Sequence, residues 1–117
     1  LLGWVEDVTG FYDSISLYCQ PSRTEGFGIE VLEAQAHARP VICSTGAGAA
    51  DLVPAEWIYP AGDVAALVRL LDDARQQDLQ AVGACARNEA REYTWDKIRQ
   101  RYVSLWRGVL EMKGDER

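Results

Sequence analysis

The chain has 117 residues, which suit at most one domain, and 48% of them are apolar, which is enough for a core. Its 18 acidic and 12 basic side chains give a formal net charge of −6. Such a chain is a poor candidate for nucleic-acid binding, because nucleic-acid backbones are bound by Lys and Arg. The sequence contains no signal-peptide pattern and no apolar run of membrane-spanning length.

The three cysteines, Cys19, Cys43 and Cys85, are widely spaced and odd in number, with no C-x-x-C pair. This pattern argues against a disulfide framework and against a zinc site. Cys19 and Cys43 fall on short apolar runs, where cysteine behaves as a small apolar residue. A reducing cytoplasm is therefore the expected location.

The first elements in chain order are two expected strands with a helix between them. Residues 1–5 predict a strand, and residues 8–16 predict a helix, which Gly10 weakens. Residues 17–20 form a short apolar run that predicts a buried strand. Pro21 ends this strand, and a turn containing glycines follows.

Two glutamates, Glu25 and Glu33, are separated by seven residues in the next segment. Glu25 lies in the glycine turn, and Glu33 lies about a turn and a half into a helix that starts at Gly28 and stops before Pro40. A helix rises ~1.5 Å per residue, so Glu33 lies within ~8 Å of the helix start. Both carboxylates can therefore face one ligand that lies across the N-terminus of this helix.

A second buried strand is expected over residues 40–44. The segment then reads as strand, glycine turn, helix and strand, which is a βαβ unit with an expected right-handed crossover. Cys19 and Cys43 lie on its two neighbouring strands. In open parallel sheets, ligands bind beyond the carboxyl ends of the strands, and the turn that contains Glu25 lies at such an end.

The residue types in this turn suit a ligand that carries both phosphates and sugars. Free N–H groups at Gly26, Phe27 and Gly28, together with the helix dipole, suit a phosphate or a sugar oxygen. The carboxylates of Glu25 and Glu33 suit paired hydroxyls on a ribose or a hexose. A nucleotide-sugar is the simplest ligand with both features.

A purely structural interpretation remains for the two glutamates. Glu25 can be a helix-start carboxylate that the dipole favours, and Glu33 a solvated helix residue. That interpretation holds for an arbitrary pair at this spacing. The glycines, the preceding strand and the Ala-rich helix favour the binding site here.

The second half of the chain predicts a loop, a strand and three helices. Residues 45–51 form a glycine loop with a short helical turn reaching Val53, and residues 57–59 predict a strand. The helices should begin at N-cap residues. The expected caps and spans are Asp63 for a helix through Ala74, Asp78 for residues 79–93, and Thr94 for the last helix.

Apolar positions in these helices predict buried faces. In the first of them Leu67, Leu70 and Leu71 are expected to be buried. In the last helix an apolar stripe is more typical of core than of a partner-binding surface. The stripe consists of Trp95, Ile98, Tyr102, Leu105, Trp106 and Val109. Residues 113–117 read as a frayed polar tail.

Three segments resemble the donor-site signature of retaining glycosyltransferases of family 4, which have the two-domain GT-B architecture. They are Glu25-Gly26-Phe27-Gly28, Val31-Leu32-Glu33-Ala34 and Ala38-Arg39-Pro40-Val41-Ile42. The likeness covers most of the chain, from Leu2-Gly3-Trp4-Val5 to Tyr93-Thr94-Trp95. It implies an α/β fold with a Rossmann-like parallel sheet, flanking helices and a long C-terminal helix. Residues 1–112 would be a partial C-terminal nucleotide-sugar-binding domain of such an enzyme, and residues 113–117 a polar tail.

The resemblance also implies roles for individual residues. Glu25 would contact hydroxyls of the transferred sugar in catalysis, and Glu33 would bind the ribose. Backbone amides would hold the sugar or the diphosphate, and they belong to Gly26, Phe27, Gly28 and Ile29. The reaction would need no metal, no cofactor and no enzyme nucleophile, with departure and attack on the same face of the sugar.

Three departures from the family pattern are present in this sequence. Residues 37–39 replace small residues that are common before the Pro-Val strand, and Asp51 stands where the family often has glutamate. Glu30 is an extra acid where an apolar residue is common, so it could alter donor preference.

The implied function is the donor-binding part of a glycosyltransferase that moves a sugar from a nucleoside diphosphate to a hydroxyl acceptor on a glycan, lipid or polysaccharide. The family supplies phosphate-binding Arg and Lys upstream of Leu2, so the chain is expected to be a fragment that lacks its N-terminal domain and is inactive alone. In the family the strands of the sheet lie in the order 3-2-1-4-5-6, and the strand at 1–5 corresponds to strand 3. Without strands 2 and 1 beside it, this strand would be poorly placed or paired unnaturally. The resemblance also allows the full-length cytoplasmic enzyme to associate peripherally with the inner face of a membrane. Base, sugar and acceptor stay open.

Two rival functions remain. One is a nucleotide-sugar-binding module without chemistry. The other is an NAD-binding Rossmann fragment, because Gly46-x-Gly48-x-x-Asp51 imitates a dinucleotide fingerprint. That loop lacks a third glycine or alanine, and Pro54 cuts its helix short. The loop instead lines the sugar or acceptor, or is a plain connector.

Two further features suggest structure rather than chemistry. His37, the only histidine, lies near a helix C-terminus, where a cation is favoured for structural reasons. Asp72-Asp73 lies mid-helix without a ligand-facing partner, so a metal-binding D-x-D motif is absent from the sequence.

Overall fold

A three-stranded parallel sheet forms the centre of the computed structural model, which describes residues 3–114. The strands lie in the order β1 (Tyr18–Gln20), β2 (Val41–Ser44), β3 (Ile58–Tyr59). Cys19 pairs with Ile42, and Cys43 pairs with Ile58. All four residues of β2 are buried, as expected of a central parallel strand. The predicted βαβ unit and the neighbouring positions of Cys19 and Cys43 are confirmed.

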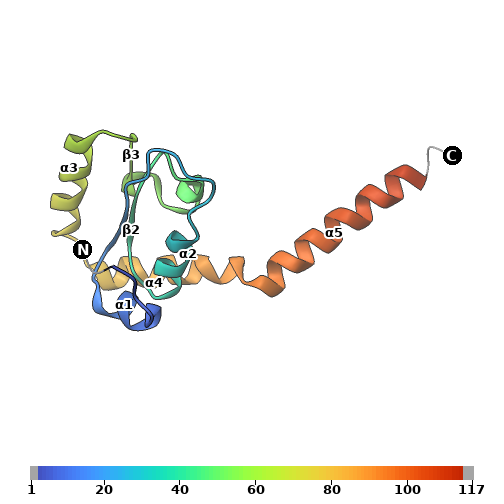
Figure 1. The fold of residues 1–117 in the computed structure, drawn as a ribbon, viewed down its shortest axis with the longest axis horizontal. Coiled ribbons are helices and arrows are strands. Elements are labelled where there is room, and N and C mark those ends of the chain that lie inside the picture. Colours follow the sequence, from blue (N-terminus) through green and yellow to red (C-terminus); the bar gives the residue numbers. More distant parts are fainter. Residues whose placement is uncertain (1–2, 115–117) are drawn as a thin grey trace.

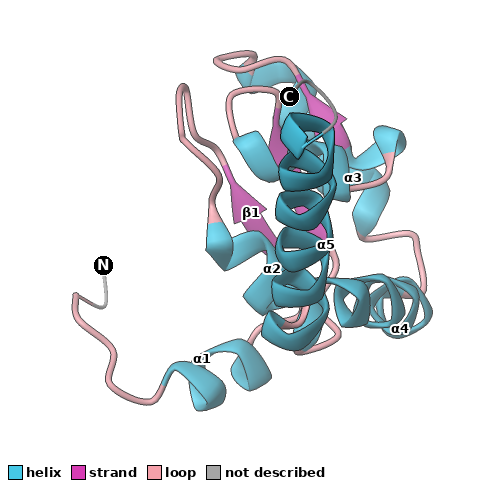
Figure 2. Cartoon of the chain, turned by 90° about the vertical axis from the view of Figure 1, so that its right-hand side faces the viewer, coloured by secondary structure: helices cyan, strands magenta, loops and turns pink. Residues whose placement is uncertain are grey.

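Helices surround this sheet and extend beyond it (Figure 1). The α-helices are α1 (Val8–Ser14), α2 (Ile29–Ala36), α3 (Val64–Ala74), α4 (Leu79–Ala90) and α5 (Trp95–Gly114). Short 3₁₀ turns are η1 (Gly48–Leu52), η2 (Ala55–Trp57) and η3 (Arg91–Tyr93). α2 packs on β1, β2 and α4, whereas α3 packs on β3. Figure 2 shows α5 standing in front of this assembly when the view is turned by 90°.

Aspartate side chains begin three of these helices. The carboxylates of Asp7, Asp63 and Asp78 accept hydrogen bonds from backbone N–H groups in the first turns of α1, α3 and α4. Such caps satisfy donors that have no partner inside the helix. The predicted caps at Asp63 and Asp78 are confirmed, and both helices begin at the residue after the cap.

The core lies between the sheet and the inner face of α2. Val31 and Ala34 of α2 and Ile42 and Cys43 of β2 are completely buried. Tyr12 of α1 closes this core at one end and is only 3% exposed. The core therefore joins α1 to the helix that carries Glu33.

The strand predicted over residues 1–5 is not present at residues 3–5, which have no regular structure. Leu1 and Leu2 lie outside the described residues. Trp4 is 90% exposed. No strand among the described residues lies beside this segment to pair with its backbone, and an unpaired strand has no ladder to stabilise it. This agrees with the expectation that the segment would be poorly placed.

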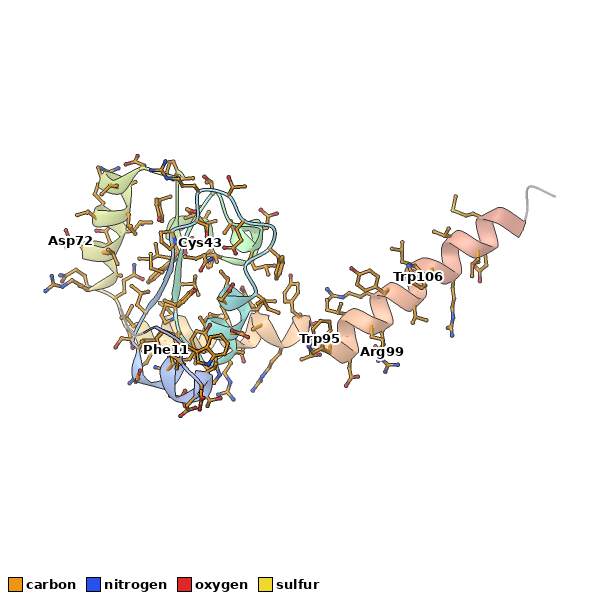
Figure 3. The ribbon with its side chains drawn as sticks, viewed as in Figure 1. Phe11, Cys43, Asp72, Trp95, Arg99 and Trp106 are labelled. Carbon is orange, nitrogen blue, oxygen red and sulfur yellow. The ribbon has the colours of Figure 1, made fainter. Side chains whose placement is uncertain are left out.

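The prediction that the apolar stripe of α5 belongs to the core is wrong. Trp95, Leu105 and Trp106 are 82%, 61% and 67% exposed. Figure 3 shows Trp106 on a part of α5 that projects away from the sheet, whereas Cys43 lies inside the body of the chain. Periodicity identifies the apolar face of a helix but not what covers it.

Smaller corrections concern single residues and element ends. Leu71 is 36% exposed, because α3 buries its small residues Ala66 and Ala74 instead. The helix predicted over 8–16 ends at Ser14, and α5 continues to Gly114 within the tail predicted over 113–117. Residues 115–117 lie outside the described part. Within residues 3–114, no helix combines the length and the apolar character needed to span a bilayer.

Candidate functional site

The turn before α2 presents backbone N–H groups at the carboxyl edge of the sheet. Gly28 caps α2 in a left-handed conformation, with φ of 85°, which favours glycine. The hydrogen bonds found within residues 3–114 give no protein acceptor to the N–H groups of residues 26–30. These donors lack a protein partner, and that they bind a ligand through Gly26, Phe27, Gly28 and Ile29 stays a prediction.

The glycine loop after β2 packs against this turn and makes hydrogen bonds with it. The Glu25 N–H donates to the Gly46 carbonyl at 2.9 Å, and Ala49 donates to the Phe27 carbonyl at 2.6 Å. A Cβ at Gly46 would collide with the carbonyls of the preceding segment, and a Cβ at Gly48 with the Gly26 carbonyl. The loop is thus part of the architecture of the turn rather than a plain connector.

Glu25 is anchored by two neighbouring polar side chains, one of which is itself held by a third. Its Oε2 accepts hydrogen bonds from the Ser22 hydroxyl at 2.7 Å and from the Gln20 amide. Gln20 Oε1 in turn accepts from the Tyr18 hydroxyl at 2.7 Å. Among the hydrogen bonds of the described residues none reaches Glu25 Oε1, so one oxygen of this carboxylate can still accept from a ligand.

Glu33 is anchored by a residue from a different element. The Tyr12 hydroxyl of α1 donates to Glu33 Oε2 at 3.0 Å. Glu33 itself is solvent-exposed. Its second oxygen, Oε1, receives no hydrogen bond from residues 3–114. In each of the two glutamates, one carboxylate oxygen thus accepts hydrogen bonds from the protein, and the other can accept one from a ligand.

The pKa of the Tyr18 hydroxyl responds to both glutamates and to Glu30. Burial, as the largest cause, and the negative charges of Glu30, Glu25 and Glu33 together raise the pKa of the Tyr18 hydroxyl to about 12. One hydroxyl therefore lies within electrostatic reach of all three carboxylates. Glu30, the extra acid, acts on the same hydroxyl as Glu25 and Glu33.

Sequence reasoning missed the side chains that hold the glutamates. Tyr12 lies within the helix predicted over residues 8–16, and 21 positions separate it from Glu33. Gln20 and Ser22 had a usable signal, because a polar residue in a predicted buried strand needs a hydrogen-bond partner. Gln20 is 8% exposed and finds that partner in Glu25.

Two pockets lie near α2. A groove of about 630 Å³ has Phe27, Ile29 and Glu33 on one side and Trp95 and Ile98 on the other. It extends the predicted site along α2 toward the first turns of α5. The groove is mostly apolar, and Glu33 is the one charged side chain among the described residues that line it.

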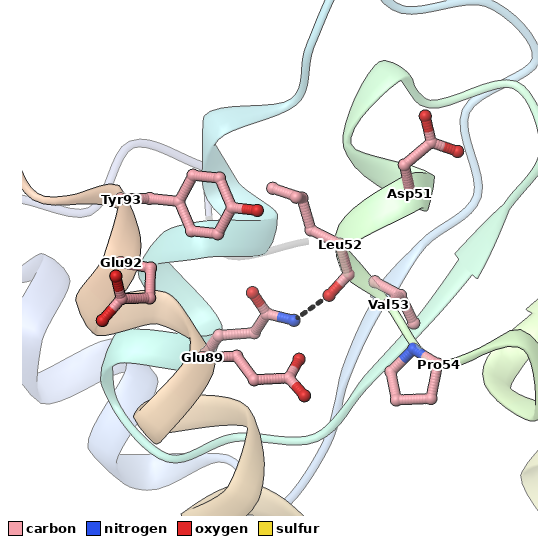
Figure 4. A pocket seen from close by; sticks show the side chains of 8 residues that line it. Asp51, Leu52, Val53, Pro54, Glu89, Glu92 and Tyr93 are labelled. Carbon is pink, nitrogen blue, oxygen red and sulfur yellow. Dashed lines mark hydrogen bonds between the residues drawn. The ribbon is translucent and has the colours of Figure 1, made fainter. Parts of the chain in front are cut away.

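The other pocket, of about 320 Å³, is acidic and is shown in Figure 4. Asp51, Glu89 and Glu92 line it, and the dashed line in the figure marks the bond from Gln35 Nε2 to the Leu52 carbonyl, 2.8 Å long. It shares no lining residue with the turn or with Glu33. It is therefore separate from the predicted site.

His37 has the structural position that was predicted for it. It is the C-cap of α2, with Nδ1 3.2 Å from the Asp13 carboxylate and its ring stacked on Tyr12. Within the described part of the chain, His, Cys, Asp and Glu side chains form no group of three or more that could hold a metal ion.

The chain belongs to the family of glycosyl transferases group 1, whose sequence profile matches residues 1–77. It is 30% identical to an uncharacterized glycosyltransferase of Methanocaldococcus jannaschii, over 97% of this chain and 31% of that protein. It is 28% identical to the sulfoquinovosyl transferase of Arabidopsis thaliana, over 86% of this chain and 22% of the relative. A D-inositol 3-phosphate glycosyltransferase of Kineococcus radiotolerans is 29% identical, over 95% of this chain and 28% of that protein. The chain thus spans less than a third of the length of these relatives.

Proposed function

We propose that the chain is the nucleotide-sugar-binding part of a retaining family 4 glycosyltransferase, within the C-terminal domain of its GT-B fold. The full-length protein would move a sugar from a nucleoside diphosphate to a hydroxyl acceptor, without a metal. The observation that carries the proposal is the row of unbonded N–H groups at residues 26–30 beside two carboxylates, each with one unoccupied oxygen.

The proposed roles follow from hydrogen-bonding chemistry. The N–H groups and the positive end of the α2 dipole take part of the negative charge of the diphosphate. Glu33 accepts hydrogen bonds from ribose hydroxyls, and Glu25 accepts from hydroxyls of the transferred sugar. In this proposal no side chain at the turn acts as a nucleophile. Catalysis then consists of positioning the substrates and stabilising the charge that develops.

The relatives support sugar transfer but leave the sugar open. The relatives described above are named for sulfoquinovosyl and D-inositol 3-phosphate transfer, and a further relative, from Escherichia coli, is named as an O-antigen chain mannosyltransferase. These differ in sugar or acceptor. The proposal for this chain therefore names a nucleoside-diphosphate sugar as the class of donor and a hydroxyl as the acceptor.

Glu33→Gln and Glu25→Ala in the full-length protein test the proposal. Glu33→Gln weakens a charge-assisted hydrogen bond to the nucleotide, so we expect UDP or GDP affinity to fall about 10-fold or more in titration calorimetry. Glu25→Ala misplaces the sugar, so we expect turnover to fall roughly 100-fold in initial-rate measurements, with little change in nucleotide affinity.

Glu111→Gln is the matched control, because Glu111 is an exposed acid on α5 and should change neither quantity. Wild-type values for both Glu25→Ala and Glu33→Gln would refute the proposal. Nucleotide-sugar binding without turnover in the wild-type protein would instead identify a binding module without chemistry.

A further inference from the structure

We infer that Tyr12 is a positioning residue for Glu33, holding one carboxylate oxygen so that the other faces the ribose hydroxyls of the nucleotide. This inference rests on the proposed function of Glu33 and extends the site to α1. The segment between Glu25 and Glu33 does not include Tyr12, which lies in the helix before β1.

The hydrogen bond itself is the first argument. The Tyr12 hydroxyl is 3.0 Å from Glu33 Oε2 and 3.4 Å from the Glu30 carbonyl oxygen. A phenol has one proton to donate. The shorter contact to a carboxylate is the stronger of the two, because hydrogen bonds to ionised acceptors are stronger than those to neutral ones. The Tyr12 hydroxyl therefore donates its hydrogen bond to Glu33.

The rigidity of Tyr12 is the second argument. Its side chain is 3% exposed, and its ring stacks on His37 with centroids 5.3 Å apart. The rings of Phe11 and Tyr18 meet it edge-on at 5.3 and 5.9 Å. The Asp13 carboxylate, on the next residue, contacts His37 as well. The hydroxyl is thus fixed by packing, whereas Glu33 is otherwise an exposed side chain on a helix surface.

The protonation of Tyr12 is consistent with a permanent donor. Burial raises its pKa, and the hydrogen bond and charge of Glu33 raise it further. The phenol therefore stays protonated at neutral pH. A donor fixed in this way removes rotamer freedom from Glu33 before the ligand arrives, which is how preorganisation increases affinity.

A structural role for the ring alone is the competing explanation. The ring packs α1 against α2, and phenylalanine would do this equally well. Tyr12→Phe therefore separates the two roles, because it removes only the oxygen. The test needs a measurement that responds to the ribose contact and not to packing.

The experiment measures binding of UDP, GDP and ADP, each against its 2′,3′-dideoxy counterpart, to the full-length protein by titration calorimetry. We expect wild type to prefer the ribose form of at least one nucleotide. Tyr12→Phe should weaken that form about 3- to 10-fold and leave the dideoxy form unchanged. Each comparison uses two ligands on the same protein sample, so a smaller folded fraction cancels in the ratio.

Two further variants complete the design. Tyr59→Phe removes the phenol oxygen of another tyrosine, a residue that is 4% exposed, and should leave the ribose preference at its wild-type value. Tyr12→Phe combined with Glu33→Gln should show no lower preference than Glu33→Gln alone, because both changes remove the same contact.

An equal loss of both ligand forms in Tyr12→Phe, or no loss in either, would overturn the inference. If Glu33→Gln abolishes the ribose preference while Tyr12→Phe retains it, only the positioning role of Tyr12 fails. If wild type shows no preference for ribose, or Glu33→Gln does not change it, the proposed role of Glu33 fails and the inference about Tyr12 fails with it.

Discussion

Ala38 occupies a backbone conformation that usually belongs to glycine. Its φ is 55°, and it is the one non-glycine residue with positive φ among residues 3–114. The Ala38 N–H bonds to the Gln35 carbonyl and the Arg39 N–H to the Ala34 carbonyl, both at 2.9 Å. This pair of bonds is a Schellman motif, in which glycine is the favoured residue at the position of Ala38. It lies within residues 37–39, where the sequence departs from the family pattern.

Ala38→Gly is therefore expected to stabilise the protein. A left-handed alanine costs about 1–2 kcal/mol, and the greater freedom of glycine in the unfolded chain returns part of this. We expect a net increase of about 0.5–1 kcal/mol in the free energy of unfolding, measured by urea denaturation. Ala84→Gly, at an exposed position inside α4, should instead lower it by about 1 kcal/mol. A similar loss in both variants would contradict the argument.

The positions of the two glutamates could be predicted from sequence, but their partners could not. Helical rise and the glycine turn place Glu25 and Glu33 near one helix start, and both features are local. The bond from Tyr12 to Glu33 depends on how α1 packs against α2, over a separation of 21 positions. A single sequence contains no signal for that packing, because Phe and Tyr fit an apolar helix face equally well.

At the scale of elements, local signals set the starts of helices well. The Asp63 and Asp78 caps and the strand–turn–helix–strand pattern required only residue types at fixed offsets. The environment predicted for α5 was wrong, because the burial of a helix face depends on neighbours far away in sequence. α5 is 20 residues long, and its apolar face is largely exposed.

Hydrogen exchange should show that α5 is much less protected than β2. Most of the stability of a helix in a protein comes from tertiary packing of its apolar face rather than from helix propensity. In the chain of 117 residues, we expect amides of residues 103–112 to have protection factors below about 10. Amides of Val41–Ser44 should exchange only with global unfolding, because the strand is buried and paired on both sides. Comparable protection in α5 and β2 would mean that α5 is covered in solution.

The whole molecule is elongated for its length. Its Cα radius of gyration is 17.5 Å, and its extents are 60 × 30 × 30 Å. A compact domain of this length has a radius of about 13 Å. The difference arises because α5 projects from the sheet and its neighbouring helices (Figure 1).

Small-angle X-ray scattering on the monomeric chain of 117 residues should therefore give a radius closer to 17.5 Å than to ~13 Å. Deleting residues 103–117 is the control, because the remaining chain should approach the compact value for its length. A full chain whose radius already equals the compact value would mean that α5 folds back onto the body.

The unbonded donors in the turn belong to the main chain, so exchanging the side chains of Phe27 or Ile29 does not remove them. Both side chains are exposed, at 45% and 51%, and only proline lacks the N–H group. Evolution can therefore vary the surroundings of a bound anion at these positions while its hydrogen-bond donors persist. Gly48 has no such latitude, because any side chain there would push the Gly26 carbonyl out of place.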